Sequence, residues 1–306
     1  MRLTAEQLHS LSVRHKAKDL AFEVVGLVVM LVSLLVLAAL FAQLVADGLV
    51  RINGSFFLEF PSRRAEQAGI LSAWVGSLLV MLVTAFAAVP VGVAAGIYLE
   101  EYAGKGWIAQ AIEINVSNLA GVPSIIYGLL ALGLLVYGLG LGQSILTAGL
   151  TLGMLILPIV IVATREALRA VPGTIREASF GLGATRWQTV RHHVLPYSSA
   201  GILTGIIIGL SRAIGETAPI ITIGALTFIA FLPPAPVTST PPFVNMDWLS
   251  SPFTVMPIQM FNWVSRPDPE FHVNAAAAGV VLVAMTLLMN ATAIWLRYRA
   301  RKRIKW

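Results

Sequence analysis

The 306-residue sequence contains no cysteine, and only 12% of its residues are charged. Without cysteine the chain can form no disulfide, no thiolate nucleophile and no cysteine-ligated metal site. Ordinary soluble domains carry about 25% charged residues, so a low charge content combined with 57% hydrophobic residues excludes an ordinary water-soluble fold. Such a composition is typical of a chain whose apolar surface lies in a lipid bilayer.

Other functional classes lack their signatures. The net charge is +6, but no basic patch is interleaved with stacking aromatic residues, so we expect no nucleic-acid binding. The five histidines show no metal-ligand clustering, and we expect no metal. No Ser/His/Asp grouping suggests catalytic residues, so we expect no enzyme. The Gly104-Lys105-Gly106 segment lacks the frame of a phosphate-binding loop, so we expect no ATP or other cofactor in this chain.

Windows almost free of charge predict an all-α, polytopic membrane protein with about six transmembrane helices. The first window holds 23 uncharged residues, enough to cross a hydrocarbon core of about 30 Å and longer than the apolar region of a signal peptide, about 7–15 residues. Pro90 predicts a kink in the second helix. We place the spans at 24–46, within 67–99, and at 113–137, 143–163, 198–231 and 273–296.

The distribution of lysine and arginine predicts the orientation. With a cytoplasmic N-terminus, 16 of these residues lie on the cytoplasmic side and four outside, so we expect both termini inside. The chain then divides into a cytoplasmic N-terminus (1–23), a first helix with an extracytoplasmic loop (24–66), a core (67–296) and a basic cytoplasmic tail (297–306). The proline-rich segment 233–242 predicts an extended extracytoplasmic loop.

The cytoplasmic segment 165–196 is the most informative loop. Pro172-Gly173 predicts the end of the fourth span, and Pro196 predicts the start of the fifth. Between them we expect two short amphipathic helices with capping boxes, separated by glycines: Thr174 with Glu177, Thr185 with Gln188, and Gly181 and Gly183 between the two. Two interpretations fit this pattern equally, a hairpin lying on lipid headgroups or a docking element for a partner protein.

Part of this loop resembles the Glu-Ala-Ala loop of permeases in ATP-binding-cassette (ABC) importers. In that family the loop is the coupling helix that seats in a cleft of the ATPase subunit. The chain departs from the pattern at Ser179 and His193, where alanine and isoleucine are usual. The resemblance implies an ATPase-coupling loop at the matching positions, which are Glu177, Ala178, Gly183, Leu195 and Pro196.

Two charges lie inside the fifth predicted span. Arg212 and Glu216 are spaced i,i+4, so we expect them to share a helix face and to pair. A charge at membrane depth costs about 2.5–3.5 kcal/mol and usually faces a pathway, but a structural ion pair would satisfy the same electrostatics. The arginine fork suits a tetrahedral oxyanion. A carboxylate beside it can accept a hydrogen bond from monohydrogen phosphate, whereas sulfate has no hydrogen to donate.

A second helix is broken by Pro123-Ser124, where freed amides and the serine hydroxyl could contact an anion. A plain kink, with the hydroxyl bonded back to the helix, fits equally well.

The stretches around Arg212–Pro219, Leu119–Gly128 and Tyr98–Tyr102 resemble the phosphate-specific ABC permeases over about residues 71–290. Thr217-Ala218-Pro219 is similar to the A-type subunit of the two permeases in such importers. The resemblance implies the MetI-like permease fold and a location in the bacterial inner membrane. The implied pathway residues are Arg212, Glu216, Thr217, Ser124 and Tyr127.

The same resemblance implies a complex. Its other members are a C-type permease, an ATPase dimer that binds the ATP, and an extracytoplasmic phosphate-binding protein. The expected partners of this chain also include phosphate and membrane lipid. The function it implies is ATP-driven phosphate import. The alternatives are import of another oxyanion, such as molybdate or phosphonate, and an ATP-independent anion channel or carrier.

Overall fold

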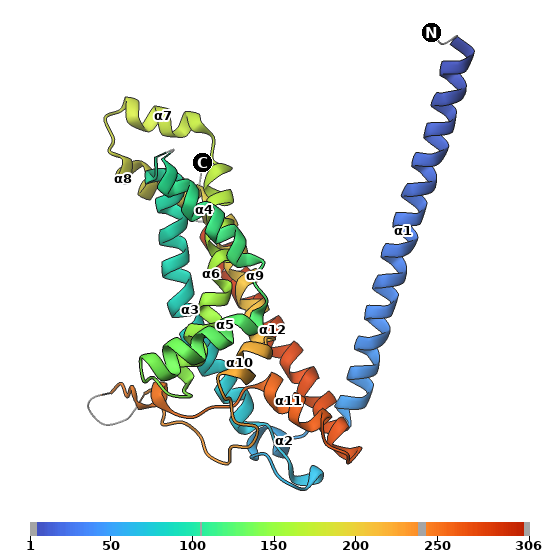
Figure 1. Ribbon diagram of the computed structural model, residues 1–306, viewed down its shortest axis with the longest axis vertical. Coiled ribbons are helices and arrows are strands. Elements are labelled where there is room, and N and C mark those ends of the chain that lie inside the picture. The colour runs from blue at the N-terminus through green and yellow to red at the C-terminus, as the bar shows by residue number, and fades with distance from the viewer. Residues whose placement is uncertain (1–4, 105, 238–242, 303–306) are drawn as a thin grey trace.

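A computed structural model describes residues 5–104, 106–237 and 243–302, and most of these residues lie in helices (Figure 1). The α-helices are α1 Ala5–Leu49, α2 Gly54–Leu58, α3 Leu71–Ile97, α4 Trp107–Ala120, α5 Ser124–Ala131, α6 Ile145–Arg169, α7 Gly173–Gly181, α8 Arg186–Thr189, α9 Leu195–Ile214, α10 Ala218–Thr222, α11 Met256–Val264 and α12 Glu270–Lys302. The π-helical turns are η2 Tyr98–Tyr102, η3 Leu132–Gly138 and η4 Val190–Val194, and the 3-10 turns are η1 Ala65–Gln67 and η5 Asp247–Ser250.

Five continuous helical segments are long and apolar enough to cross a membrane, and a bent pair of helices is the sixth candidate. The five segments are Lys18–Leu49, Leu71–Tyr102, Ile145–Arg169, Arg186–Ile214 and Glu270–Arg299. The predicted all-α, polytopic fold is therefore confirmed. Pro90 lies inside α3, as expected.

The span predicted at 113–137 is a bent pair of helices and not one continuous helix. The chain forms α4 and then α5, and the two are bent by 106° at residues 121–123. Pro123 has no backbone N–H to continue the hydrogen-bond ladder of α4, so the helix ends there and a new one begins at Ser124. The predicted break at Pro123-Ser124 is present, but it turns the chain through more than a right angle.

The prediction of a fifth span at 198–231 is wrong at both ends. Helical structure is continuous from Arg186 through η4 into α9, so Pro196 does not start the span. The π-helical turn just before Pro196 already departs from the regular ladder, so the missing N–H of proline is accommodated there. At the other end the helix stops at Ile214, and Gly215 caps it.

Helix α6 lies at the centre of the bundle between α3 and α9. A Cβ atom at Gly149 of α6 would overlap the side chain of Val83 on α3, and one at Gly205 of α9 would overlap Ala163 of α6. Small residues at these crossings let the helix backbones approach closely, which is how membrane helices associate without a hydrophobic driving force. The close packing fixes the position of α9, which carries Arg212 of the candidate site.

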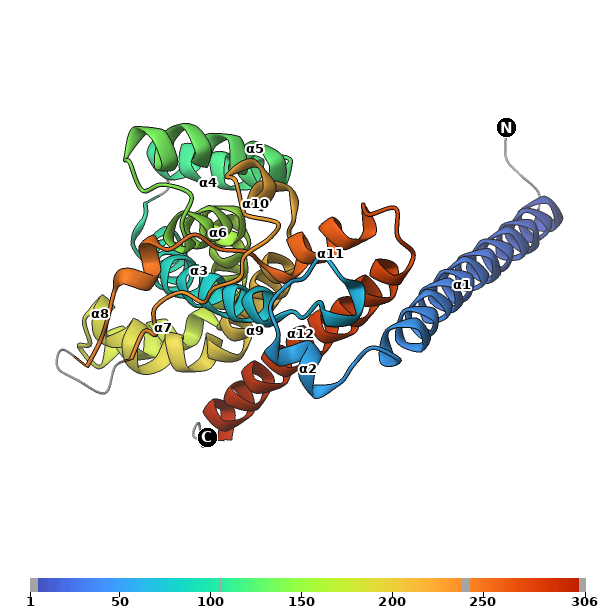
Figure 2. The same cartoon turned by 90° about the horizontal axis from the view of Figure 1, so that it is seen from below.

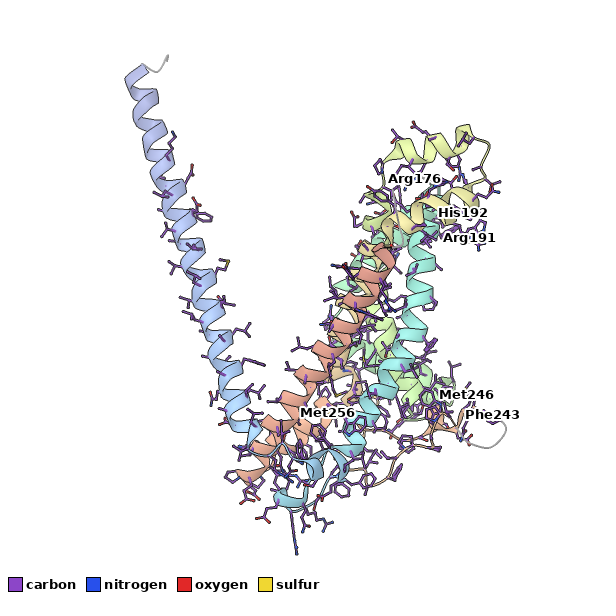
Figure 3. The ribbon with its side chains drawn as sticks, turned by 180° about the vertical axis from the view of Figure 1, so that it is seen from behind. Arg176, Arg191, His192, Phe243, Met246 and Met256 are labelled. Carbon is purple, nitrogen blue, oxygen red and sulfur yellow. The ribbon has the colours of Figure 1, made fainter. Side chains whose placement is uncertain are left out.

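Helix α1 leans away from the bundle, and its last turns meet α12 (Figures 1 and 3). A Cβ atom at Gly48 would lie 2.8 Å from the backbone of Ala276, so the two helices are in tight contact there. Arg51, just beyond α1, donates through Nε to Oδ1 of Asn274 at 3.1 Å, and Asn274 donates to the Ala65 carbonyl at 2.8 Å. These bonds tie α1, α12 and the intervening loop together at the end opposite α7.

The start of α1, the end of α12 and the α7–α8 loop all lie at one end of the molecule (Figure 1). The predicted N-terminal segment 1–23 is helical from Ala5 onward and runs directly into the first span. The predicted domain boundaries stay predictions. Residues 1–4, 238–242 and 303–306, which include parts of the expected terminal segments and of the proline-rich loop, lie outside the described residues.

Candidate functional site

Arg212 and Glu216 form an ion pair where the fifth span ends. Arg212 occupies the last turn of α9, and its Nε donates to Oε1 of Glu216 at 3.2 Å. The expectation that the two share a helix face is wrong, because α9 stops at Ile214 and Glu216 lies beyond it. Gly215 ends the helix, and Pro219 lies in the first turn of α10. The pair therefore spans a break between two helices.

The two members of the pair differ in their access to the surroundings. The Arg212 side chain is 43% exposed and the Glu216 side chain 17%. Glu216 also lines a cavity of about 10 Å³, whose other walls are mostly apolar and include Ser77 and Val255. A cavity of that size holds about one water molecule. This cavity is therefore too small for an anion the size of phosphate.

Helix α5 brings two further predicted residues close to this break. Ser124 is its first residue and is half-buried. The buried Tyr127 donates its hydroxyl to the Leu119 carbonyl of α4 at 2.7 Å, which braces the bend between α4 and α5.

Helices α5 and α10 pack side by side (Figure 2). Gly128 makes this contact possible, because a Cβ atom there would lie 2.6 Å from Cα of Pro219 and would overlap the Thr222 hydroxyl. Thr217 directly precedes α10, and its side chain does not cap that helix. The structure thus gathers the predicted pathway residues at three helix ends, and their pathway roles stay predictions.

The loop between the fourth and fifth spans has one of its two expected capping boxes. The Thr185 hydroxyl accepts from the Gln188 amide, and the Gln188 side chain accepts from the Thr185 amide, as predicted. The prediction of a capping box at Thr174 and Glu177 is wrong. Helix α7 begins one residue earlier, at Gly173, and Pro172 stands at the N-cap position with no side-chain cap.

The predicted coupling residues divide between the tip and the base of this loop. Glu177, Ala178 and Gly183 are exposed, and Gly183 has the positive φ of +82° expected of a glycine that ends a helix. Leu195 and Pro196 are half-buried at the start of α9. The loop also exposes large apolar side chains, namely Phe180, Leu182 and Trp187, with Leu182 as much as 90% exposed.

The buried Ser179 contributes a contact that the sequence reasoning missed. Its hydroxyl lies 2.8 Å from the Thr189 hydroxyl, and this bond joins α7 to α8. Serine replaces the usual alanine of the resembling family at this position, and the replacement was the available signal. The substitution gives the loop a polar tie between its two helices.

A second missed feature is a set of ion pairs at the base of the same loop. It links acidic residues at the end of α3 and in the middle of α4 to arginines of α6 and α7. Figure 3 shows Arg176 in this region, at the end of the bundle that carries α7. The adjacent Glu100 and Glu101 were visible in sequence, but their partners lie 65 or more residues away.

Comparison with known proteins places the chain in a family. Residues 88–306 match the family described as the binding-protein-dependent transport system inner membrane component. The chain belongs to this family. It is therefore a transport subunit and a multi-pass protein of the bacterial inner membrane, and the resemblance seen in its motifs is confirmed.

Several relatives are permease proteins of phosphate transport systems. The chain is 31% identical to PstA 1 of Mycobacterium tuberculosis, with 77% of this chain and 72% of the relative covered. It is 32% identical to PstA of Xylella fastidiosa, with 83% and 84% covered. It is also 32% identical to PstC of Haemophilus influenzae, with 65% and 70% covered.

The fold of the family member agrees with a solved structure. The inward-facing MetNI methionine ABC transporter matches with a TM-score of 0.55 at 18% identity, covering 74% of this chain and 93% of that chain. At this identity the likeness concerns the fold alone. The predicted MetI-like permease fold is confirmed.

Proposed function

We propose that this family member is a membrane-spanning permease subunit of an ATP-driven importer of inorganic phosphate. The observation that carries the proposal is the Arg212–Glu216 pair at a helix break, in a chain whose relatives over most of its length are phosphate permeases. Intramembrane ionisable groups usually mark a pathway, and broken helices usually line one. The two features coincide in this permease.

Arg212 receives the phosphate in this proposal. Glu216 engages its Nε, and the two terminal nitrogens of the guanidinium fork are then directed to the phosphate oxygens. Glu216 accepts a hydrogen bond from the hydroxyl group of monohydrogen phosphate, so the pair discriminates a protonated oxyanion from sulfate. Thr217 and Ser124 contribute hydroxyl groups at neighbouring helix ends, and Tyr127 holds α5 in position.

A second permease completes the site. Arg212 is substantially exposed, and the cavity beside Glu216 is too small for phosphate, so this chain supplies one wall of a pathway. The similarity to both PstA and PstC relatives supports a heteromeric pair in which this chain is the A-type member and its partner the C-type. An extracytoplasmic phosphate-binding protein delivers the substrate.

The α7–α8 loop is the docking element for an ATPase dimer, which binds and hydrolyses the ATP. Exposed Glu177, Ala178 and Gly183 face that subunit, together with the apolar side chains at the loop tip. The loop lies at the same end as the start of α1 and the end of α12, which supports the orientation with both termini in the cytoplasm (Figure 1).

The test is ATP-dependent phosphate uptake by the reconstituted four-component complex. Arg212→Ala should lower uptake by about tenfold or more, since a hydrogen bond to a charged group contributes about 1.5–3 kcal/mol. Arg299→Ala, on the cytoplasmic end of α12, is the control and should keep the parental rate. Parental uptake by Arg212→Ala would remove the site assignment. Uptake of molybdate in place of phosphate, or uptake without ATP, would favour the alternatives.

A further inference from the structure

Three arginines and three glutamates form a cluster where four structural elements meet at the cytoplasmic end. This ion-pair cluster consists of Glu100 and Glu101 on η2, Glu113 on α4, Arg165 and Arg169 on α6, and Arg176 on α7. The ion pairs join α6 to η2, α6 to α4, and α7 to η2.

Arg165 is the buried centre of the cluster, with its side chain only 9% exposed. Its Nη1 lies 3.1 Å from Oε1 of Glu113, and its Nε lies 3.5 Å from Oε2 of Glu100. Arg169, one turn later on α6, donates to the same Glu100 oxygen at 2.9 Å. Helix α6 is thereby bound to the end of α3 on one side and to α4 on the other.

Arg176 fastens α7 to this assembly. Its guanidinium donates to Oε1 of Glu101 at 2.6 Å, and it also donates to the carbonyls of Leu168 at 2.9 Å and Val171 at 2.8 Å. All three acceptors are engaged by one planar fork, which lysine could not reproduce. The pair is mostly buried, so water screens it less than it screens an ordinary surface ion pair. Helix α7 therefore cannot shift without either breaking this contact or carrying η2 with it.

Helix α4 is held at its cytoplasmic half by few contacts. Val116 is its one buried residue, and it packs with Leu99 and Ile161. Glu113 supplies the polar attachment, to Arg165. At its other end α4 passes through the bend into α5, which packs against α10 beside the Arg212–Glu216 break. A displacement applied at Glu113 is thus delivered to the helix that borders the candidate pathway.

We propose that the ion-pair cluster is the linkage that carries the motion of α7 to α3 and, through α6, to the α4–α5 pair. Arg176 and Glu101 are positioning residues in this linkage, and Arg165 is the central residue that connects Glu100 with Glu113. The inference rests on the proposed function, since an ATPase docked on the α7–α8 loop supplies the motion. The cluster provides the physical contact that coupling between two distant sites requires.

The test uses the full importer complex and three variants. Arg176→Gln removes the charge of the α7 contact, and Arg176→Glu combined with Glu101→Arg restores a pair of opposite sign. Glu166→Gln is the matched control, because Glu166 pairs at 3.1 Å with Arg169 of its own helix and joins no second element. The measurements are ATP hydrolysed per phosphate imported, and ATPase subunit retained on purification.

Arg176→Gln should retain the ATPase subunit and raise the ATP hydrolysed per phosphate by about tenfold, the usual scale of a lost coupling. The swapped pair restores the ion pair but not the two carbonyl bonds of Arg176, so it should return this ratio part of the way to that of the parent, and Glu166→Gln should leave it unchanged. An unchanged ratio in Arg176→Gln would overturn the inference. Loss of the ATPase subunit from both the neutralised and the swapped complexes would also overturn it, because the pair would then be a folding requirement of the loop.

A distance measurement separates this inference from the proposed function. The chain has no native cysteine, so spin labels on Thr174→Cys in α7 and Tyr98→Cys in η2 report on these elements alone. Their separation should be the same without nucleotide and with ATP, and it should change between the two states in Arg176→Gln. A change already present in the parent would refute the linkage. Failure of the parent to import phosphate would reject the proposed function and leave this distance result standing.

Discussion

Gly128 offers a sharp test of the contact between α5 and α10. A Cβ atom at this position would lie 2.6 Å from Cα and 2.7 Å from the carbonyl oxygen of Pro219, and it would overlap the Thr222 hydroxyl. Threonine could rotate its side chain, but the Pro219 atoms belong to the backbone of α10. Gly128→Ala therefore forces the two helices apart.

The size of the effect follows from ordinary contact distances. Carbon atoms pack at about 3.5–4 Å, so α10 must shift by about 1 Å to admit the new methyl group. Overpacking of this kind costs about 1–3 kcal/mol. Replacing a helical glycine by alanine otherwise gains about 0.5–1 kcal/mol. Gly133, in the turn η3 that follows α5, has open space around its Cβ position, so Gly133→Ala should show only the gain.

The assay compares the thermal unfolding of the two purified variants in detergent, followed by phosphate uptake in the reconstituted complex. Gly128→Ala should unfold several degrees below Gly133→Ala, since about 1 kcal/mol corresponds to about 2–4 °C for a domain of 150–250 residues. It should also import more slowly, because α10 adjoins Glu216. Equal stability and equal uptake in the two variants would show that α5 and α10 are not packed as described.

Two further predictions concern the loop and the selectivity of the site. Thr185→Ala should weaken retention of the ATPase subunit by about fivefold, since loss of an N-cap costs about 1 kcal/mol. Thr174→Ala removes no cap and should leave retention unchanged. Equal retention in the two variants would contradict the capping geometry. Glu216→Gln should relax discrimination between phosphate and sulfate in competition uptake assays, because the amide nitrogen can donate to the unprotonated anion; unchanged discrimination would refute the role of the carboxylate.

Much of the fold follows from local sequence. A charge-poor run of more than 20 residues must satisfy its own backbone in a bilayer, and a helix does so without help from other segments. The spans at 24–46 and 273–296 each lie inside an observed helix for this reason, and the span at 143–163 matches α6, which begins at Ile145. The Thr185–Gln188 capping box is equally local, since both partners lie within one helical turn. Motif order was enough to identify the permease family.

The path of the broken helices needed the tertiary structure. Pro123 and Gly215 are residue types at which a helix can end. The 106° turn at Pro123, however, depends on where α4 and α5 pack. Arg212 and Glu216 were expected on one helix face, yet they meet across a helix end. The sequence shows where the backbone hydrogen bonds of a helix can be interrupted. Packing against distant segments decides the direction that the chain takes after the interruption.

The sequence by itself determined that this chain spans a membrane, and it predicted, by resemblance to a known family, a docking loop at the fourth connection and an ion pair near the end of the fifth span. Only the tertiary structure decided which charges are partners. In the sequence Arg176 is one of many cations expected on the cytoplasmic side, and nothing local indicates its partner Glu101, which lies 75 residues away. Ion pairing depends on distances of a few ångström, and these are set by the packing of α3, α6 and α7 rather than by any local pattern.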